Sequence, residues 1–171
     1  MEADELKEAA ERAGRQGEKR VGLTMALVAA FLALATMLGH RTHTEEVVLQ
    51  TRATDQWAYY QAKNSRSHMY QADAKLAAAS VAGKEVAAQF LADGKKEAGD
   101  ADRIRGDAER LEEETNVTAN RAKYFDIAEV MLEISIVLCS VTLLTAIRTF
   151  WLSSFLTTLA GLVLIAFAAL R

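Results

Sequence analysis

Charged side chains divide the chain into two polar and two apolar stretches. Residues 21–38 contain no charged side chain, and residues 127–170 contain only Arg148 beyond the first two helical turns of that stretch. By contrast, residues 39–126 hold 13 of the 20 basic and 15 of the 23 acidic side chains. Apolar stretches of this length are typical of membrane-spanning helices, so the pattern predicts a membrane protein with a polar insert.

The lengths of the apolar stretches predict three spans. A helix over residues 21–38 reaches roughly 27 Å, close to the thickness of a bilayer's hydrocarbon core. The second stretch is about twice as long and must double back near Arg148 and Thr149, where Phe150 and Trp151 suit a membrane interface. A signal peptide is the rival interpretation of the first stretch, but six acidic residues in the preceding tail argue against it. We expect a charged tail at 1–20 and transmembrane helices at 21–39, 127–147 and 149–170.

The polar insert carries a helical repeat. Small or apolar residues recur at alternating spacings of four and three, as in helices that pack side by side in coiled coils. The first predicted seam consists of Ala58, Ala62, Ser65, Met69, Ala72, Leu76, Ala79 and Gly83. The second consists of Ile104, Ala108, Leu111, Thr115, Thr118, Ala122 and Phe125. Two such seams predict an antiparallel helical hairpin over residues 40–126.

Glycines suggest where these helices begin and end. Gly39 is a candidate for the end of the first span, with Thr42 as the N-cap of a new helix. A turn near Gly83 gives two arms of matched length, roughly 60 Å each, whereas Asp93 and Gly94 offer an alternative turn at 93–100. The predicted fold is an all-α membrane protein, with three transmembrane helices and a long extramembrane, coiled-coil-like hairpin between the first and second spans.

Aromatic residues are unexpectedly frequent in the first arm, in the stretch DQWAYYQAKNSRSHMY. Trp57, Tyr59, Tyr60 and Tyr70 fall on the flanks of the predicted seam. On a straight arm Trp57 would lie about 25 Å from the membrane, too far for an interfacial aromatic belt. We therefore predict that these four residues contact another polypeptide, either a second copy or a different protein. Stacking on a small molecule or a nucleic acid is a further alternative.

Acidic residues mark the start of the second span. Asp126, Glu129 and Glu133 lie on one helix face, and Glu129 and Glu133 are the predicted intramembrane polar residues. An acidic side chain inside a membrane is costly and is a functional hypothesis by default. The alternatives are a proton or cation path in an oligomer, and pairing with nearby basic residues or with Ser and Thr of neighbouring spans.

Other candidate chemistry is weak. His40 and His43 have a spacing that a metal could use, but two histidines alone are a poor predictor, so we expect no metal. The chain contains no phosphate-binding glycine loop, zinc-ligand spacing or nucleophile elbow, so we predict no cofactor and no enzymatic activity. A net charge of −3 without a basic run argues against nucleic acid as a partner.

Basic residues near the spans favour a cytoplasmic N-terminus. Five of them precede the first span, whereas Arg41 and Arg52 follow it. The hairpin and the C-terminus are then expected on the opposite side. Small residues also recur every four positions in the first span, at Ala26 and Ala30 and at Ala29 and Ala33, which favours close packing within or between chains.

Two stretches resemble a known family. QWAYYQAK at Gln56 to Lys63, with YFDIAEVMLEISIVLCS at Tyr124 to Ser140, resembles the bacterial membrane proteins grouped as domain of unknown function 4337. The family's layout of one span, a long helical insert and two closing spans is similar to the one predicted above, and it implies a bacterial inner membrane. The resemblance implies no assigned activity.

These observations favour a non-enzymatic membrane scaffold. Its expected partners are membrane lipid and either further copies of itself, bound through the hairpin, or the subunits of a larger membrane complex such as a respiratory or photosynthetic one. The alternative is an oligomeric membrane protein that conducts protons or ions with Glu129 and Glu133.

Overall fold

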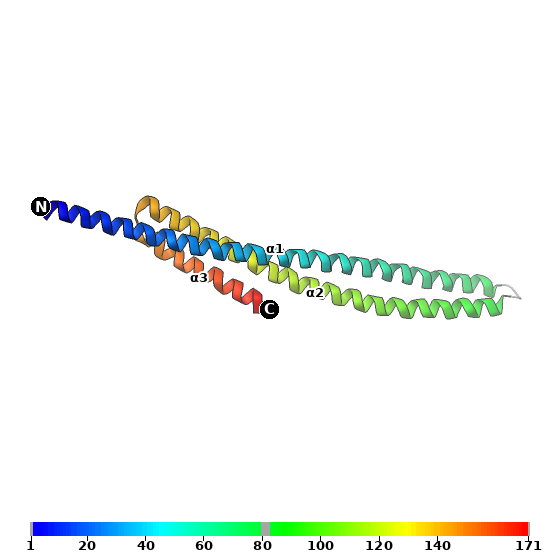
Figure 1. Cartoon of the computed structure of the whole chain (residues 1–171). Helices are drawn as coiled ribbons and strands as arrows, with labels where there is room; N and C mark the ends of the chain where they lie inside the picture. The colour runs from blue at the N-terminus through cyan, green and yellow to red at the C-terminus, as the bar shows by residue number, and fades with distance from the viewer. Residues whose placement is uncertain (1, 80–82, 171) are drawn as a thin grey trace. The chain divides into compact units, whose positions relative to one another are not determined.

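A computed structural model describes residues 2–79 and 83–170, with the side chains of residues 14, 17–79 and 83–170. This part of the chain consists of three α-helices and has no strand: α1 (Glu2–Ala78), α2 (Lys84–Thr145) and α3 (Arg148–Leu170) (Figure 1). Each of the three is long and apolar enough to cross a membrane, judged by length and composition. The all-helical fold is as the sequence predicted.

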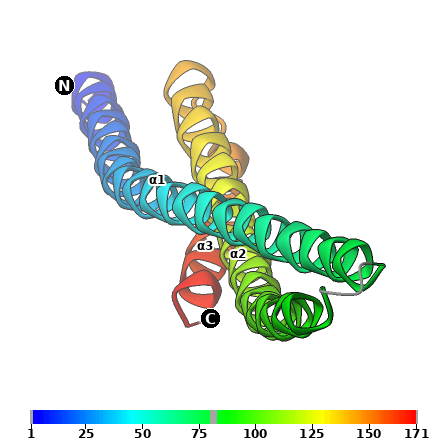
Figure 2. The ribbon, with the colours of Figure 1, turned by 90° about the vertical axis from the view of Figure 1, so that its right-hand side faces the viewer.

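The helices form two compact units. Residues 1–43 and 119–171 belong to one, called here the three-helix unit, and residues 44–118 belong to the other, the two-helix unit. Within the three-helix unit, the N-terminal end of α1 and the connection between α2 and α3 lie toward the same end (Figures 1 and 2).

Small residues let the helices of the three-helix unit approach closely. A Cβ atom built on Gly161 of α3 would lie 3.0 Å from Leu132 Cγ and 3.2 Å from the Ala128 carbonyl oxygen of α2. Residues of α1 complete this core, which consists of Val28, Ala35 and Leu132 with Leu32, Ile136 and Ile165 packed against it. Because Gly161 has no side chain, α3 can pack backbone to backbone on α2.

Hydroxyl groups also join α2 to α3. The Ser135 hydroxyl donates to the Ser154 carbonyl at 2.9 Å and lies 2.7 Å from the Thr158 hydroxyl. The Cys139 thiol donates a weak hydrogen bond of 3.4 Å to the Ser154 hydroxyl. All of these except Thr158 are fully buried, so the interface between the two helices is polar as well as closely packed.

α1 does not end at Gly39. The helix continues through Gly39 and Thr42, and the Thr42 hydroxyl donates to the Leu38 carbonyl at 2.9 Å instead of capping a new helix. A Cβ on Gly39 would lie 3.4 Å from Phe125 Cβ. The predicted helix end was wrong because this glycine provides room for Phe125 of α2 and does not adopt a left-handed conformation.

The two-helix unit confirms one predicted seam and corrects the other. In α2, Ile104, Ala108, Thr115 and Thr118 are buried, as predicted. In α1, the predicted seam is exposed: Met69 is 63% and Leu76 74% exposed. The buried positions are instead Ala53, Lys63, Ser67 and Ala74. The prediction failed because it assumed apolar residues, whereas Lys63 and Ser67 are polar residues that find partners on α2.

The contact between α1 and α2 runs through residues 93–100. These residues, the alternative position for the turn, lie inside α2, and the Ser67 hydroxyl donates to the Gly94 carbonyl at 2.9 Å. A Cβ on Gly94 would lie 3.2 Å from Tyr70 Cβ, so this glycine permits close packing and does not mark a turn. The turn predicted near Gly83 includes residues 80–82, which lie outside the described residues.

The connection between α2 and α3 contains an unusual backbone conformation. Ala146 has a φ of 56°, in the left-handed region that favours glycine. Its N–H donates to the Thr142 carbonyl at 2.8 Å, which closes the C-terminus of α2. α3 then begins at Arg148, next to the position where the sequence predicted the chain to double back.

Candidate functional site

The aromatic residues of α1 contact one another. Trp57 and Tyr60 are both half-buried, and their rings meet edge to face with centroids 5.6 Å apart. Tyr59 is 48% exposed, and Lys63 Nζ lies 5.9 Å from its ring centroid. Trp57 and Tyr60 therefore hold each other in one orientation, while Tyr59 keeps about half of its surface free within the chain.

Tyr70 belongs to the contact between the two helices. Its ring stacks on Phe90 of α2 with centroids 6.2 Å apart and an interplanar angle of 29°. The prediction that all four aromatic residues avoid this contact was wrong for Tyr70, because the buried seam of α1 lies on a different face from the predicted one. Contact with another chain stays a prediction for all four.

A cluster of charges lies inside the two-helix unit. Lys63 is only 9% exposed, and its Nζ donates to Glu97 Oε1 and to Asp100 Oδ2, each at 3.1 Å. Arg66 Nε and Arg103 Nη2 lie 4.0 Å from the carboxylates of Glu97 and Asp100, respectively. One buried ammonium thus joins two carboxylates of α2, and exposed guanidinium groups lie beside it.

The electrostatics of this cluster favour its charged form. Hydrogen bonds to Asp100 and Glu97 raise the pKa of Lys63, and the bond from Lys63 lowers the pKa of Asp100. Both shifts move the pKa away from neutrality, so the cluster is suited to holding two helices together and unsuited to proton transfer. Sequence reasoning missed it, although Ala53, Tyr60, Ser67 and Ala74 recur every seven residues and Lys63 lies three residues after Tyr60 and four before Ser67.

The two intramembrane candidates have different surroundings. Glu129 is partly buried, and its Oε1 accepts a hydrogen bond of 2.7 Å from the Thr36 hydroxyl of α1. This agrees with the expectation that an acid here pairs with Ser or Thr of a neighbouring helix. Glu133 is exposed within the described chain.

The packing of α2 on α3 fixes the level of Glu133. The neighbouring Leu132 contacts Gly161, which lies about 20 Å along a helix of roughly 34 Å. At the far end of the same contact, Arg121 Nε donates to the Ala168 carbonyl at 3.2 Å. Glu133 is therefore level with the middle of α3, because α2 contacts α3 from Arg121 onward.

One of the two histidine candidates contacts an acidic residue of α2. His43 Nε2 lies 3.0 Å from Asp126 Oδ1, and both side chains are about half exposed. Asp126 thus contacts His43, whereas the sequence suggested a nearby arginine or lysine as its partner. Among the described side chains, no group of three or more His, Cys, Asp or Glu residues could hold a metal ion.

Comparison with known proteins identifies the family. The model of the domain of unknown function DUF4337 matches residues 17–171, and the chain therefore belongs to this family, as the two quoted stretches indicated. No curated protein and no solved structure matches the chain.

Proposed function

We propose that this member of the DUF4337 family is a non-enzymatic membrane scaffold that assembles with further copies of itself. In this proposal the three-helix unit crosses a bacterial inner membrane three times, and the two-helix unit is a hairpin outside it. The apolar side chains left exposed on the three-helix unit support the membrane placement, because lipid would cover them. They include Leu23, Leu27, Leu144, Leu152, Leu156 and Leu159.

The observation that carries self-assembly is a second stripe on α1. Ala58, Ala62, Met69, Ala72 and Leu76 are all exposed, although they repeat with the spacing of a coiled-coil seam. At about 100° per residue they lie nearly opposite the buried seam that contacts α2. α1 therefore has two seams. One contacts α2 of the same chain, and the other has no partner among the described residues.

A second copy is the occupant that fits the stripe best. Copies inserted in one membrane share the same orientation, so equivalent helices from two chains run parallel and can pair stripe on stripe around a two-fold axis. Small residues alternate with Met69 and Leu76, which lets the larger side chains fill the space beside the smaller ones. Trp57 and Tyr59 lie on either flank of this stripe, where the exposed parts of their rings would contact the partner.

The three-helix unit offers a further surface for the same assembly. Ala26, Ala29, Ala30 and Ala33 are exposed on α1, and small residues at four-residue spacing favour close contact between helices in a membrane. The basic residues that precede this part of α1 support a cytoplasmic N-terminus, with the hairpin and the C-terminus on the opposite side.

Native mass spectrometry of the full chain in detergent tests self-assembly. Met69→Glu with Leu76→Glu places two charges on the stripe, and we expect the oligomer to dissociate into monomers. Ala88→Glu with Gln89→Glu adds two acidic side chains at exposed positions of α2 and should leave the mass unchanged. An unchanged oligomer in the stripe variant would contradict the proposal.

Docking on a larger membrane complex is the alternative form of the same scaffold role. In that case the stripe would bind a subunit of the complex instead of a second copy. The protein extracted gently from its own membrane would then be found in a larger assembly with other subunits, and the Met69→Glu and Leu76→Glu variant would be released from it.

Glu133 favours a second candidate function. If α2 spans the membrane, this exposed carboxylate lies near the middle of the bilayer, where contact with lipid is costly. An oligomer in which the carboxylates of several copies face a common path would remove that contact, and it could conduct protons or cations. Proton flux into proteoliposomes tests this: Glu133→Gln should abolish flux without changing the oligomer mass, whereas a parent protein without flux would exclude conduction.

A further inference from the structure

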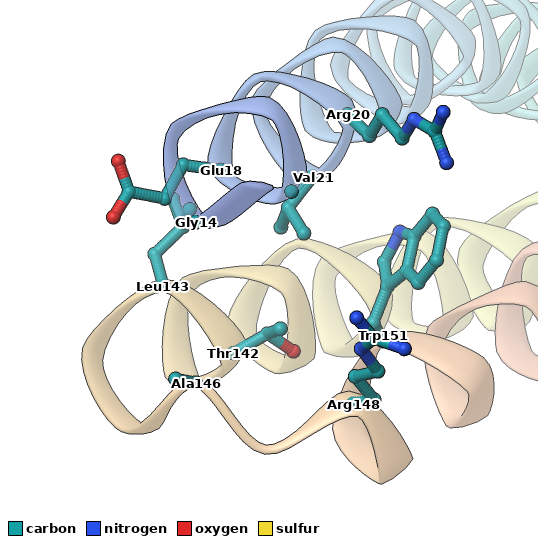
Figure 3. Close-up of a pocket in the computed structure, with 10 residues that line it drawn as sticks. Gly14, Glu18, Arg20, Val21, Thr142, Leu143, Ala146, Arg148 and Trp151 are labelled. Carbon is teal, nitrogen blue, oxygen red and sulfur yellow. The ribbon is translucent and has the colours of Figure 1, made fainter. Parts of the chain in front are cut away.

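A groove of about 400 Å³ lies at the end of the three-helix unit where α2 turns into α3 (Figure 3). Val21 of α1 and Leu143 of α2 contribute apolar walls. The polar groups of the lining come from Glu18, Arg20, Thr142, Arg148 and Trp151. The groove therefore combines apolar surface with two guanidinium groups.

Both guanidinium groups are available to bind a ligand. Figure 3 shows those of Arg20 and Arg148 on either side of the Trp151 indole, whereas the Glu18 carboxylate points away from them. Neither arginine takes part in an ion pair between the described side chains. Trp151 Nε1 donates to the Thr24 hydroxyl at 3.3 Å, which fixes the indole between the two charges.

The chemistry of these groups matches a phosphate. Guanidinium groups bind phosphate oxygens through paired hydrogen bonds. α3 begins at Arg148, so its first free N–H groups add partial positive charge at the same place. A soluble phosphate would use only the polar part of the groove, whereas a lipid phosphate would also cover Val21 and Leu143 with an acyl chain.

We propose that this groove binds the phosphate of an anionic phospholipid. The inference uses the membrane placement of the proposed function but not its self-assembly. Arg20 and Trp151 lie at ends of apolar helical stretches, where arginine and tryptophan meet lipid headgroups. Basic residues next to a span attract anionic lipids on the cytoplasmic side, the side proposed above for the N-terminus.

Native mass spectrometry with added lipid tests the site. The purified full chain is titrated with phosphatidylglycerol or with phosphatidylcholine of the same acyl composition, and bound lipid and oligomer mass are read from the same spectra. We expect tighter binding of phosphatidylglycerol and a fall of roughly tenfold or more in its apparent affinity in Arg20→Gln with Arg148→Gln. The control Lys19→Gln with Arg41→Gln removes two positive charges at exposed positions outside the groove and should bind like the parent.

Three outcomes would overturn the proposal. Equal binding of the two lipids would show that the groove does not select an anion. Equal losses in the groove variant and its control, with helical content intact by circular dichroism, would show that net charge alone matters. Displacement of phosphatidylglycerol by millimolar inorganic phosphate would assign the groove to a soluble anion. If the Arg20→Gln with Arg148→Gln variant loses lipid but keeps the same number of chains in its oligomer, the site is confirmed independently of self-assembly. A parent chain that binds lipid as a monomer would contradict self-assembly alone.

Discussion

Lys63 of α1 donates a hydrogen bond of 3.1 Å to Asp100 of α2 while only 9% of its surface is exposed. A lysine this well buried is stable only beside an opposing charge, and Asp100 and Glu97 supply it. We expect Lys63→Ala to lower the melting temperature by several degrees, because it leaves two carboxylates close together without their common partner. Arg66→Ala, which removes a half-exposed cation 4.0 Å from Glu97, should have a much smaller effect. Equal shifts, measured by circular dichroism, would contradict a structural role for the cluster.

The same cluster predicts a pH dependence of stability. Asp100 has a lowered pKa in the folded chain, so its contribution is present above its unfolded pKa of about 3.9 and is lost as pH falls through the lower folded value. Lys63 has a raised pKa, so its contribution is lost only as pH rises through a value above about 10.4. Asp100→Asn should therefore reduce the melting temperature at pH 7, and the difference from the parent should shrink as pH falls below about 4. A difference independent of pH would show that the shape of the side chain, and not its charge, matters.

Glycine gives a further test of how closely α2 and α3 pack. Alanine at position 161 would place a Cβ 3.0 Å from Leu132 Cγ and 3.2 Å from the Ala128 carbonyl, and the carbonyl cannot easily move. We expect Gly161→Ala to destabilise the three-helix unit by about 1–2 kcal/mol, despite the better helix propensity of alanine. Gly99 is also helical, but a Cβ there meets nothing within 4 Å, so Gly99→Ala should be stabilising by about 0.5–1 kcal/mol. Chemical unfolding in detergent should show these opposite signs.

These glycines also show why the sequence predicted some elements and not others. Gly39 and Gly94 were interpreted as helix ends or turns, but both lie within helices against Phe125 and Tyr70. A single sequence does not distinguish a glycine that ends a helix from one that admits a neighbour, because both depend on the missing side chain. The seam of α2 was predictable because most of its positions are small or apolar.

The seam of α1 was not predictable from hydrophobicity. Its centre is occupied by Lys63 and Ser67, and their partners lie far away in the sequence. The exposed stripe of small residues has the stronger apolar pattern, so hydrophobicity alone predicts this stripe as the contact between α1 and α2. The position of Glu133 relative to α3 could not be predicted for a related reason. It depends on the register between α2 and α3, which the close contact at Gly161 sets.

The strained connection between α2 and α3 predicts a stabilising substitution. Ala146 adopts a φ of 56°, a conformation that costs an L-residue about 1 kcal/mol relative to glycine. We expect Ala146→Gly to raise the free energy of unfolding by about 0.5–1 kcal/mol, because glycine adopts this conformation without the Cβ contact. Ala88→Gly, at an exposed position in the second turn of α2, should lower it by a similar amount. A decrease in both variants would contradict this account of Ala146.

The exposed stripe on α1 predicts which residues meet across the oligomer. If copies share one orientation in the membrane and pair stripe on stripe, the same residue of each chain lies near the two-fold axis, within reach of a disulfide. We expect Ala62→Cys to form an intermolecular disulfide under mild oxidation in native membranes. Ala74→Cys should not, because Ala74 is only 3% exposed and lies in the seam that contacts α2. The single native cysteine, Cys139, is fully buried and should leave the parent uncross-linked. Cross-linking through Ala74 but not Ala62 would instead show that the helices exchange partners between chains, and it would overturn the pairing proposed here.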